Sequence, residues 1–406
     1  MLERIPANRP ASVFAARPLF MSLAATIAPW WSMPAQATER IALRLVRAGS
    51  RPALQPNIIA LDFSQQPRWP DTTALGETLR RLQAQRDCLR RLAAAGVAVP
   101  PADDSALLEL GRAVAALLPP DTRAALLVAV RQARSKGNAL HIQVEAEADA
   151  LAALAIPWEL LVLPMGLSAN GARASDDFVL LHPDIALTRQ LIGWGHAPSA
   201  PLVRPLDIQT FAATPSDAHP IDVAAARDSI TNNSERWYAG PATLAEIHAR
   251  LRASQPQIVH LLCHGELDDT GIGQRCHLLL THSDGRAQRV APRDLARTLL
   301  TSRQLQLVVL QSCHSGTLAS GPGERASSAA LALLGYGVPA VVAMQGEIGQ
   351  SGALDFARMC LAALAGGSPI AQAVAAGRGA MHAAGHADWM LPVLYSSRTL
   401  AAGRQR

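Results

Sequence analysis

The chain has 406 residues, of which 49% are hydrophobic and 17% charged, with a formal net charge of +5. This apolar fraction excludes a mainly disordered chain, and the length predicts one large domain with an appendage, or two domains. Five cysteines, an odd number, argue against a disulfide framework and favour a reducing compartment. The basic residues are dispersed arginines apart from Lys136, so we expect no specific nucleic-acid partner.

The first 40 residues contain spread prolines and predict irregular structure. No apolar run approaches the roughly 20 residues that span a bilayer, so we expect no transmembrane segment and a cytoplasmic location. The alternative is secretion, because arginines precede the apolar stretch 19–31 and Ala35-Gln36-Ala37 is similar to a signal-peptidase site. A mature chain that starts at Thr38 would support this alternative.

The next elements are two short strands and a helix. Residues 41–47 and 57–63 alternate or run apolar and predict a strand pair, and residues 73–95 have leucines at helical spacing. Gly96 and Pro100-Pro101 end this helix, so the composition changes near residues 96–104. We therefore expect an N-terminal region over residues 1–104, which regulates the protein or completes its sheet, and a second domain over residues 105–406.

Helices and strands alternate through the second domain. Helices are predicted at residues 106–118, 151–161, 221–231, 243–253, 293–301, 327–334, 350–364 and 370–381. Strands are predicted at residues 140–144, 207–213, 258–263, 277–281, 305–311 and 338–343. Nearly continuous apolar strands between amphipathic helices predict an α/β fold with a mostly parallel sheet covered by helices on both faces. Ligands of such sheets bind at the carboxyl ends of the strands.

Two of the apolar strands end in reactive residues. His260-Leu261-Leu262-Cys263-His264-Gly265 closes one, and Gln311-Ser312-Cys313-His314-Ser315-Gly316 closes the other. Each pairs a His or Cys with a following glycine, which lets the backbone turn sharply. His264 precedes Cys313 by 49 residues, and caspase-type peptidases carry their catalytic His about 50 residues before the Cys.

This arrangement suits nucleophilic catalysis. A thiol with a pKa near 8.5 is largely protonated at neutral pH, and a nearby imidazole activates it and then protonates the leaving amine. The oxyanion needs fixed N–H donors, for which the backbone amides of Gly265 and Cys313 are the natural pair.

The chain resembles a CHAT-domain peptidase, of the clan that also holds caspases, metacaspases and separases. The resemblance covers about residues 105–397 and rests on His260 to Gly265, on the Ser312–Gly316 block, and on Pro157-Trp158-Glu159-Leu160-Leu161. Segments 338–345 and 389–395 add to it. It implies a caspase-like three-layer sandwich, with His264 as base and acid and Cys313 as nucleophile.

The resemblance also suggests the residues that bind the substrate side chain before the cleaved bond, in the S1 pocket. Gln311 stands where metacaspases have an Asp, so we expect no strong preference for Arg or Lys. Met344, Gln345 and Gly346 follow as S1 candidates. Alternatively, an acidic pocket is restored by Glu266, itself an S1 candidate, with Asp268, Asp269 and Glu347.

Other reactive side chains have simpler explanations. His260 and Cys263 are expected in the core, as are Cys88 and Cys360 in helical patterns, and His314 is expected in a solvent-facing loop. No metal-ligand spacing is present, so we expect neither metal nor cofactor. The acidic cluster Glu145, Glu147 and Asp149 favours a solvated edge over a calcium site. The Gly321-Pro322-Gly323 turn predicts a mobile loop beside the site.

These features predict a cysteine endopeptidase that cleaves a specific protein partner. The resemblance further implies a bacterial protein of antiviral defence or regulated cell death, with a gasdermin-like pore former or another defence effector as substrate. One alternative is a catalytically inactive CHAT scaffold that binds partners through the same cleft. Another is a nucleic-acid-responsive sensor that uses the N-terminal arginines. The oligomeric state is left open.

Overall fold

The computed structural model describes residues 38–46, 58–62, 72–95, 103–147, 150–164, 178–192, 202–230, 235–269, 274–318 and 328–397. All of these lie in one compact unit, residues 36–406. The predictions for residues 1–37, including the signal sequence, and for the 321–323 loop fall outside the described residues.

A ten-stranded sheet forms the centre of this unit, in the order β2-β1-β3-β4-β13-β12-β11-β7-β5-β6. Its pairs are parallel except for β12 with β13. The strands are β1 (Thr38–Val46), β2 (Ile58–Asp62), β3 (Ala139–Ala146), β4 (Ile185–Leu191), β5 (Ile208–Ala212), β6 (Glu235–Trp237), β7 (Ile258–Leu262), β11 (Leu307–Gln311), β12 (Ala340–Met344) and β13 (Pro392–Ser396).

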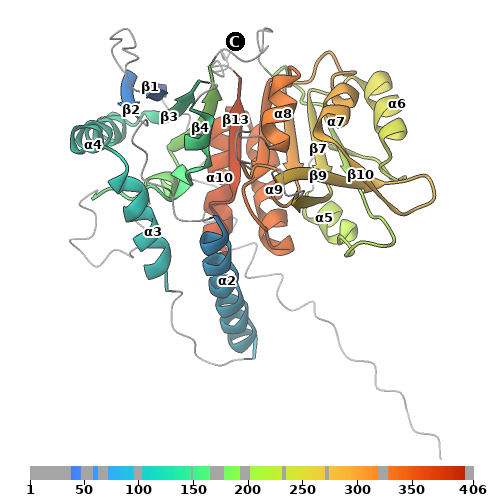
Figure 1. The fold of residues 1–406 in the computed structure, drawn as a ribbon, viewed down its shortest axis with the longest axis horizontal. Helices are drawn as coiled ribbons and strands as arrows, with labels where there is room; N and C mark the ends of the chain where they lie inside the picture. Colours follow the sequence, from blue (N-terminus) through green and yellow to red (C-terminus); the bar gives the residue numbers. More distant parts are fainter. Residues whose placement is uncertain are drawn as a thin grey trace, which may run out of the picture. The chain divides into compact units, whose positions relative to one another are not determined.

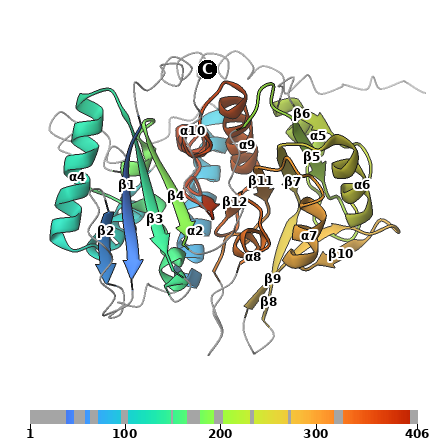
Figure 2. The ribbon, with the colours of Figure 1, turned by 90° about the horizontal axis from the view of Figure 1, so that it is seen from above.

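Helices cover both faces of the sheet (Figure 1). In Figure 2, β11 and β12 lie between α9 (Gln350–Ala365) and α10 (Ile370–Ala383) on one side and α7 (Pro292–Leu299) and α8 (Ala329–Gly335) on the other. The remaining helices in this half are α5 (Val223–Ser229), which contacts α9, and α6 (Leu244–Ser254), which contacts α7. The predicted three-layer α/β fold with a mostly parallel sheet is confirmed.

The N-terminal strands belong to the same sheet. β1 pairs with β3 over eight residues, from Thr38 opposite Ala139 to Leu45 opposite Ala146. Arg44 on β1 forms an ion pair of 2.8 Å with Glu145 on β3. The sheet therefore continues across residue 104, and Glu145 is a buried, ion-paired side chain rather than part of a solvated acidic edge.

Three helices remain: α2 (Thr72–Ala94), α3 (Ser105–Ala116) and α4 (Pro120–Ser135). α4 contacts β1 and β3 at this end of the sheet and α3 contacts residues 158–160, whereas α2 is bonded to residues 385 and 387 after α10. No single helix among the described residues is long and apolar enough to cross a membrane. Taken together, α3 and α4 are long and apolar enough by length and composition, but the two helices are bent by 114° relative to each other.

Several sequence predictions of secondary structure were wrong or incomplete. The helix predicted over residues 151–161 is two short 3-10 helices, η2 (Leu151–Ala155) and η3 (Trp158–Leu160), because Pro157 lacks the N–H that a continuous helix needs. A third such helix is η6 (Val179–Leu181). One helix, α4, and four strands, β4, β6, β8 (His264–Asp269) and β10 (Ala287–Val290), were not predicted from the sequence.

A small antiparallel sheet follows β7. It consists of β8 (His264–Asp269), β9 (Gln274–Thr281) and β10 (Ala287–Val290), in the order β10-β9-β8. His264 is thus the first residue of a strand that leaves the main sheet, and this change of direction places it at the carboxyl end of β7.

Candidate active site

The two reactive strand ends lie side by side. β7 and β11 pair in parallel, from Ile258 opposite Leu307 to Leu262 opposite Gln311. Both strands are buried along their whole length, which explains their apolar sequences. In each pair, the β11 residue follows its β7 partner by 49 positions, which is also the separation of His264 and Cys313. His264 and Cys313 therefore leave the sheet at the same level.

Gly265 brings the two segments into direct contact. A Cβ atom on this residue would lie 1.9 Å from the carbonyl oxygen of Cys313 and 2.6 Å from the hydroxyl of Ser312. Real Cβ atoms never approach a backbone oxygen so closely, so any larger residue would push the segments apart. The backbones of His264-Gly265 and Ser312-Cys313 are therefore packed together.

One hydrogen bond orients the His264 ring. Its Nε2 lies 2.7 Å from the carbonyl oxygen of His219, in the loop after β5. A carbonyl oxygen only accepts hydrogen bonds, so Nε2 carries the proton and Nδ1 keeps its lone pair. The ring can therefore accept a proton at Nδ1. Sequence analysis missed His219 because its contribution is a main-chain atom, which any residue provides.

Cys313 is a free, partly buried cysteine. Burial raises the pKa of its thiol, and Glu347 adds to this increase, whereas the backbone N–H of Ile348 opposes it. The thiol is therefore protonated at neutral pH. Its neighbour Cys263 is fully enclosed, with a pKa raised to about 12 by burial, which confirms the core prediction for Cys263 and leaves Cys313 as the accessible thiol of the two.

The residues around Cys313 form a tightly bonded turn, the nucleophile loop (residues 312–316). The Ser315 hydroxyl donates to the Ser312 carbonyl at 2.7 Å and accepts from the Met344 N–H at 3.0 Å. The Gly316 N–H donates to the Met344 carbonyl at 2.7 Å, and the Tyr395 hydroxyl donates to the Gly316 carbonyl at 3.0 Å. Hydrogen bonds within the loop, together with hydrogen bonds to Met344 of β12 and Tyr395 of β13, therefore fix its position.

His314 adds a link from this loop to residues 345–348, the flanking loop. It adopts a φ of 58°, and its N–H donates to the Gly346 carbonyl at 3.2 Å. Its ring lies 3.7 Å from the Glu347 carboxylate and is only partly exposed, so it is not the free solvent-facing residue that the sequence suggested. Burial lowers the pKa of the His314 ring.

Of the predicted S1 residues, Gln311 lies beside the nucleophile loop. It is buried, and its Oε1 accepts from Nε2 of His260 at 2.8 Å. His260 is fully buried as well, and its Nδ1 faces Glu235 of β6 at 3.4 Å. A buried row of polar side chains thus leads from β6 to Gln311.

The other S1 candidates have different surroundings. Met344 is fully buried in the sheet, and the Gln345 side chain points inward to buried partners. Gly346 packs against Leu391. Glu266 pairs with Arg289 of β10 at 2.9 Å. The side chains of Asp268 and Asp269 lie outside the described residues. Of the four residues proposed for an acidic S1 pocket, the structure therefore describes the side chains of Glu266 and Glu347.

The N-terminal region reaches the flanking loop through α2. Arg80 lies 3.7 Å from Glu347, and Gln83 accepts from the Ala387 N–H at 3.1 Å. Arg86 is buried, forms an ion pair with Asp104 and donates to the Gly385 carbonyl at 3.3 Å. Cys88, in contrast, is exposed on this helix, so its predicted packing role was wrong.

One protein family and two solved structures are similar to this chain. The CHAT domain family profile matches residues 101–394, and no curated protein matches the chain. Two crystal structures of the Saccharomyces cerevisiae separase-securin complex are similar, with 11% and 10% identity and TM-scores of 0.38 and 0.37. Each alignment covers 63% of this chain but only 15% and 16% of the other chain, so this protein spans a small part of those chains' length.

Proposed function

The chain belongs to the CHAT domain family, and from this premise we propose that it is a cysteine endopeptidase with Cys313 as nucleophile and His264 as base and acid. The observation that carries this proposal is the contact between Gly265 and Cys313. This contact brings an oriented imidazole and a partly buried thiol to the same edge of the sheet.

The geometry supports a covalent mechanism. The Cys313 sulfur attacks the scissile carbonyl carbon while Nδ1 of His264 takes the thiol proton, and the carbonyl π electrons move to oxygen. The N–H groups of Gly265 and Cys313 stabilise this oxyanion. Its collapse breaks the C–N bond, and His264 returns the proton to the leaving amine. A water, deprotonated by His264, then attacks the thioester carbon. The tetrahedral intermediate that forms breaks its C–S bond and releases the acid, and the sulfur takes the proton back from His264.

The raised pKa of Cys313 fits this order of events. A thiol that is protonated at rest loses its proton only when His264 accepts it during the attack. The backbone N–H of Ile348, which favours the thiolate, lowers the cost of this transfer.

Gln311 supports a neutral or hydrogen-bonding S1 preference. Its amide oxygen is already bonded to His260, so its NH₂ group is what remains to meet a substrate side chain. An NH₂ donor does not pair with the cationic donors of Arg or Lys. We therefore expect no strong cleavage after Arg or Lys.

The physiological substrate that we propose is a specific protein partner in a bacterial defence or cell-death pathway. A gasdermin-like pore former or another defence effector would suit this role, and the reaction would take place in the cytoplasm. These assignments follow the family resemblance.

A peptide library read by mass spectrometry tests the activity. The full-length protein, Cys313→Ala and Cys88→Ala are incubated with the same library, where Cys88→Ala removes an exposed cysteine that is not part of the nucleophile loop. We expect cleavage by the wild type and Cys88→Ala and none by Cys313→Ala. Equal cleavage by all three contradicts the assignment, and no cleavage by any favours the scaffold alternative. Cleavage mainly after Arg overturns the S1 prediction.

A further inference from the structure

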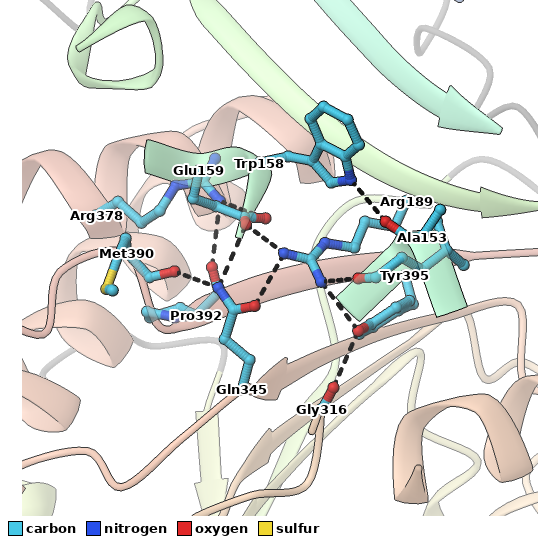
Figure 3. Close-up of polar contacts among 11 residues, drawn as sticks. Ala153, Trp158, Glu159, Arg189, Gly316, Gln345, Arg378, Met390, Pro392 and Tyr395 are labelled. Atoms are coloured by element: carbon cyan, nitrogen blue, oxygen red, sulfur yellow. Dashed lines mark hydrogen bonds and ion pairs between the residues drawn. The ribbon is translucent and has the colours of Figure 1, made fainter. Parts of the chain in front are cut away.

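We propose that Tyr395 and Gln345, aligned by the buried Arg189–Glu159 ion pair, are positioning residues that hold the two loops around Cys313. This inference rests on the proposed function, and it extends that function to residues outside the His-Cys pair. Figure 3 shows these side chains, which come from β4, η3, β13 and the flanking loop. We refer to Glu159, Arg189, Gln345, Arg378 and Tyr395 together as the arginine network.

Arg189 is the centre of the network. It is fully buried, and its Nη2 forms an ion pair with Glu159 and donates to Oε1 of Gln345 at 3.0 Å. Its Nη1 donates to the Tyr395 hydroxyl at 3.3 Å and to the Leu154 carbonyl. One planar guanidinium thus orients a residue of the flanking loop and a residue of β13 at the same time.

The Tyr395 hydroxyl has a defined direction because of Arg189. A guanidinium only donates hydrogen bonds, so the hydroxyl oxygen accepts from Arg189 and its own proton points away. That proton is donated to the Gly316 carbonyl at 3.0 Å. Tyr395 therefore transmits the position of Arg189 to the end of the nucleophile loop, three residues after Cys313.

Gln345 fixes the other side of Cys313. Its Nε2 donates to Glu159 at 3.3 Å and to the Met390 carbonyl at 3.0 Å, and its backbone N–H donates to the Leu391 carbonyl at 3.0 Å. The next residues carry the Gly346 carbonyl, which accepts from His314, and the Ile348 N–H, which faces the thiol. The side-chain amide of Gln345 is thus bonded to buried partners. Gln345 therefore acts on the surroundings of Cys313 through the backbone of the flanking loop.

The charge balance argues against a purely stabilising role. Arg189, Arg378 and Glu159 are fully buried, which leaves two cations for one carboxylate. Arg378 lies 3.9 Å from Glu159, and among the described residues its Nε and Nη2 have no hydrogen-bond partner. Burial lowers the pKa of Arg378 to about 10, so it is still charged at neutral pH. Apolar side chains would fill this space at less desolvation cost, whereas directed hydrogen bonds to two loops require polar groups.

The test uses Tyr395→Phe in the full-length protein, with Tyr336→Phe as control, because Tyr336 is an exposed ring that faces Arg297 and is not part of the network. Glu159→Gln would leave two buried arginines without a counter-charge and is expected to fold poorly. Tyr395→Phe keeps the buried ring and removes only the hydroxyl. Two quantities are measured: kcat and KM on the best peptide of the library, and the alkylation rate of each cysteine by iodoacetamide, read by peptide mass mapping.

We expect the two readouts to move in opposite directions. In Tyr395→Phe, kcat falls about tenfold or more while KM stays within about twofold, because a displaced reacting atom costs rate rather than binding. A released loop exposes the thiol, so alkylation of Cys313 becomes about threefold faster or more, as thiolate access increases. Cys88 serves as internal reference, and the enclosed Cys263, Cys276 and Cys360 stay unlabelled.

Two results would overturn the proposal. One is a Cys313 alkylation rate unchanged in Tyr395→Phe, which means that the hydroxyl does not hold the loop. The other is increased labelling of the buried cysteines together with Cys313, which indicates general destabilisation. A wild type without peptidase activity would instead count against the proposed function, and the alkylation pattern would still decide whether Tyr395 positions the loop.

Discussion

The two strand ends that form the candidate site are held in different ways. The nucleophile loop after β11 is bonded through Ser315, Gly316 and Tyr395 to the interior and to β12 and β13. The His264 ring, at the end of β7, is partly exposed, and within the described part of the chain one hydrogen bond, to the His219 carbonyl, orients it.

This difference matches the tasks of the two residues. The sulfur must approach one carbon atom along a defined line, so its position has to be set before the substrate arrives. The imidazole must take a proton from sulfur and deliver it to nitrogen, which is served by one anchored nitrogen and some freedom of the ring. If rigidity belongs to the Cys313 side, substitutions that disturb the nucleophile loop cost more activity than a substitution at the His264 anchor.

Gly265→Ala should have the largest effect, because it disturbs both strand ends. The new methyl group would meet the Cys313 carbonyl oxygen at 1.9 Å. We expect a loss of kcat/KM of about a hundredfold or more and a destabilisation of about 1–3 kcal/mol, measured by peptide cleavage and thermal melting. Gly366→Ala, where the nearest atom is 3.4 Å away, is the control and should behave as wild type. Full activity of Gly265→Ala would refute the close contact.

Ser315→Ala should be next, because it acts on the nucleophile loop alone. The Met344 N–H would lose its acceptor, and an unsatisfied buried donor costs about 1–3 kcal/mol. We expect this loss in urea unfolding, together with a lower kcat. The control is Ser254→Ala, a partly exposed helical serine whose hydroxyl donates to the Arg250 carbonyl. Similar unfolding curves for both variants would argue against a braced loop.

The pH dependence of Cys313 alkylation tests the resting state of the thiol. Since burial raises its pKa, less thiolate is present at neutral pH, and the alkylation rate should keep rising beyond pH of about 8.5, the usual thiol pKa. Iodoacetamide labelling from pH 6 to 10, followed by mass mapping, gives this profile. A plateau well below pH 8.5 would reveal a preformed thiolate paired with His264, and the proton would then not move during the attack.

His219→Ala should have the smallest effect. The hydrogen bond to His264 uses the main-chain carbonyl, which alanine retains, so we expect kcat/KM within about threefold of wild type. Steady-state kinetics across the pH range measures it. A large loss, or a shifted acid limb of the pH profile, would mean that the His219 side chain itself takes part.

The sequence predicted the strands of the site because local patterns determine them. The apolar runs 258–263 and 305–311 closely match β7 and β11, and the 49-residue spacing of His264 and Cys313 equals the register of the two strands. Their carboxyl ends meet because neighbouring parallel strands end at the same edge.

What the sequence did not reveal depends on contacts between distant residues. Arg189 lies on β4, a strand that was missed because three consecutive polar residues, 188–190, interrupt its apolar pattern, although all seven residues are buried. Its partner Glu159 lies 30 residues away along the chain. The inward direction of Gln345 follows from the same non-local network, which is why that residue was assigned to a pocket by motif alone.

Trapping of the acyl-enzyme tests the central claim most directly. An ester of the best-cleaved peptide is mixed with the full-length protein, quenched in acid after short times, and the modified residue is located by mass mapping. We expect a thioester on Cys313 that forms and decays with turnover and is missing in Cys313→Ala. Turnover with an adduct on another residue, or turnover that persists in Cys313→Ala, would contradict it.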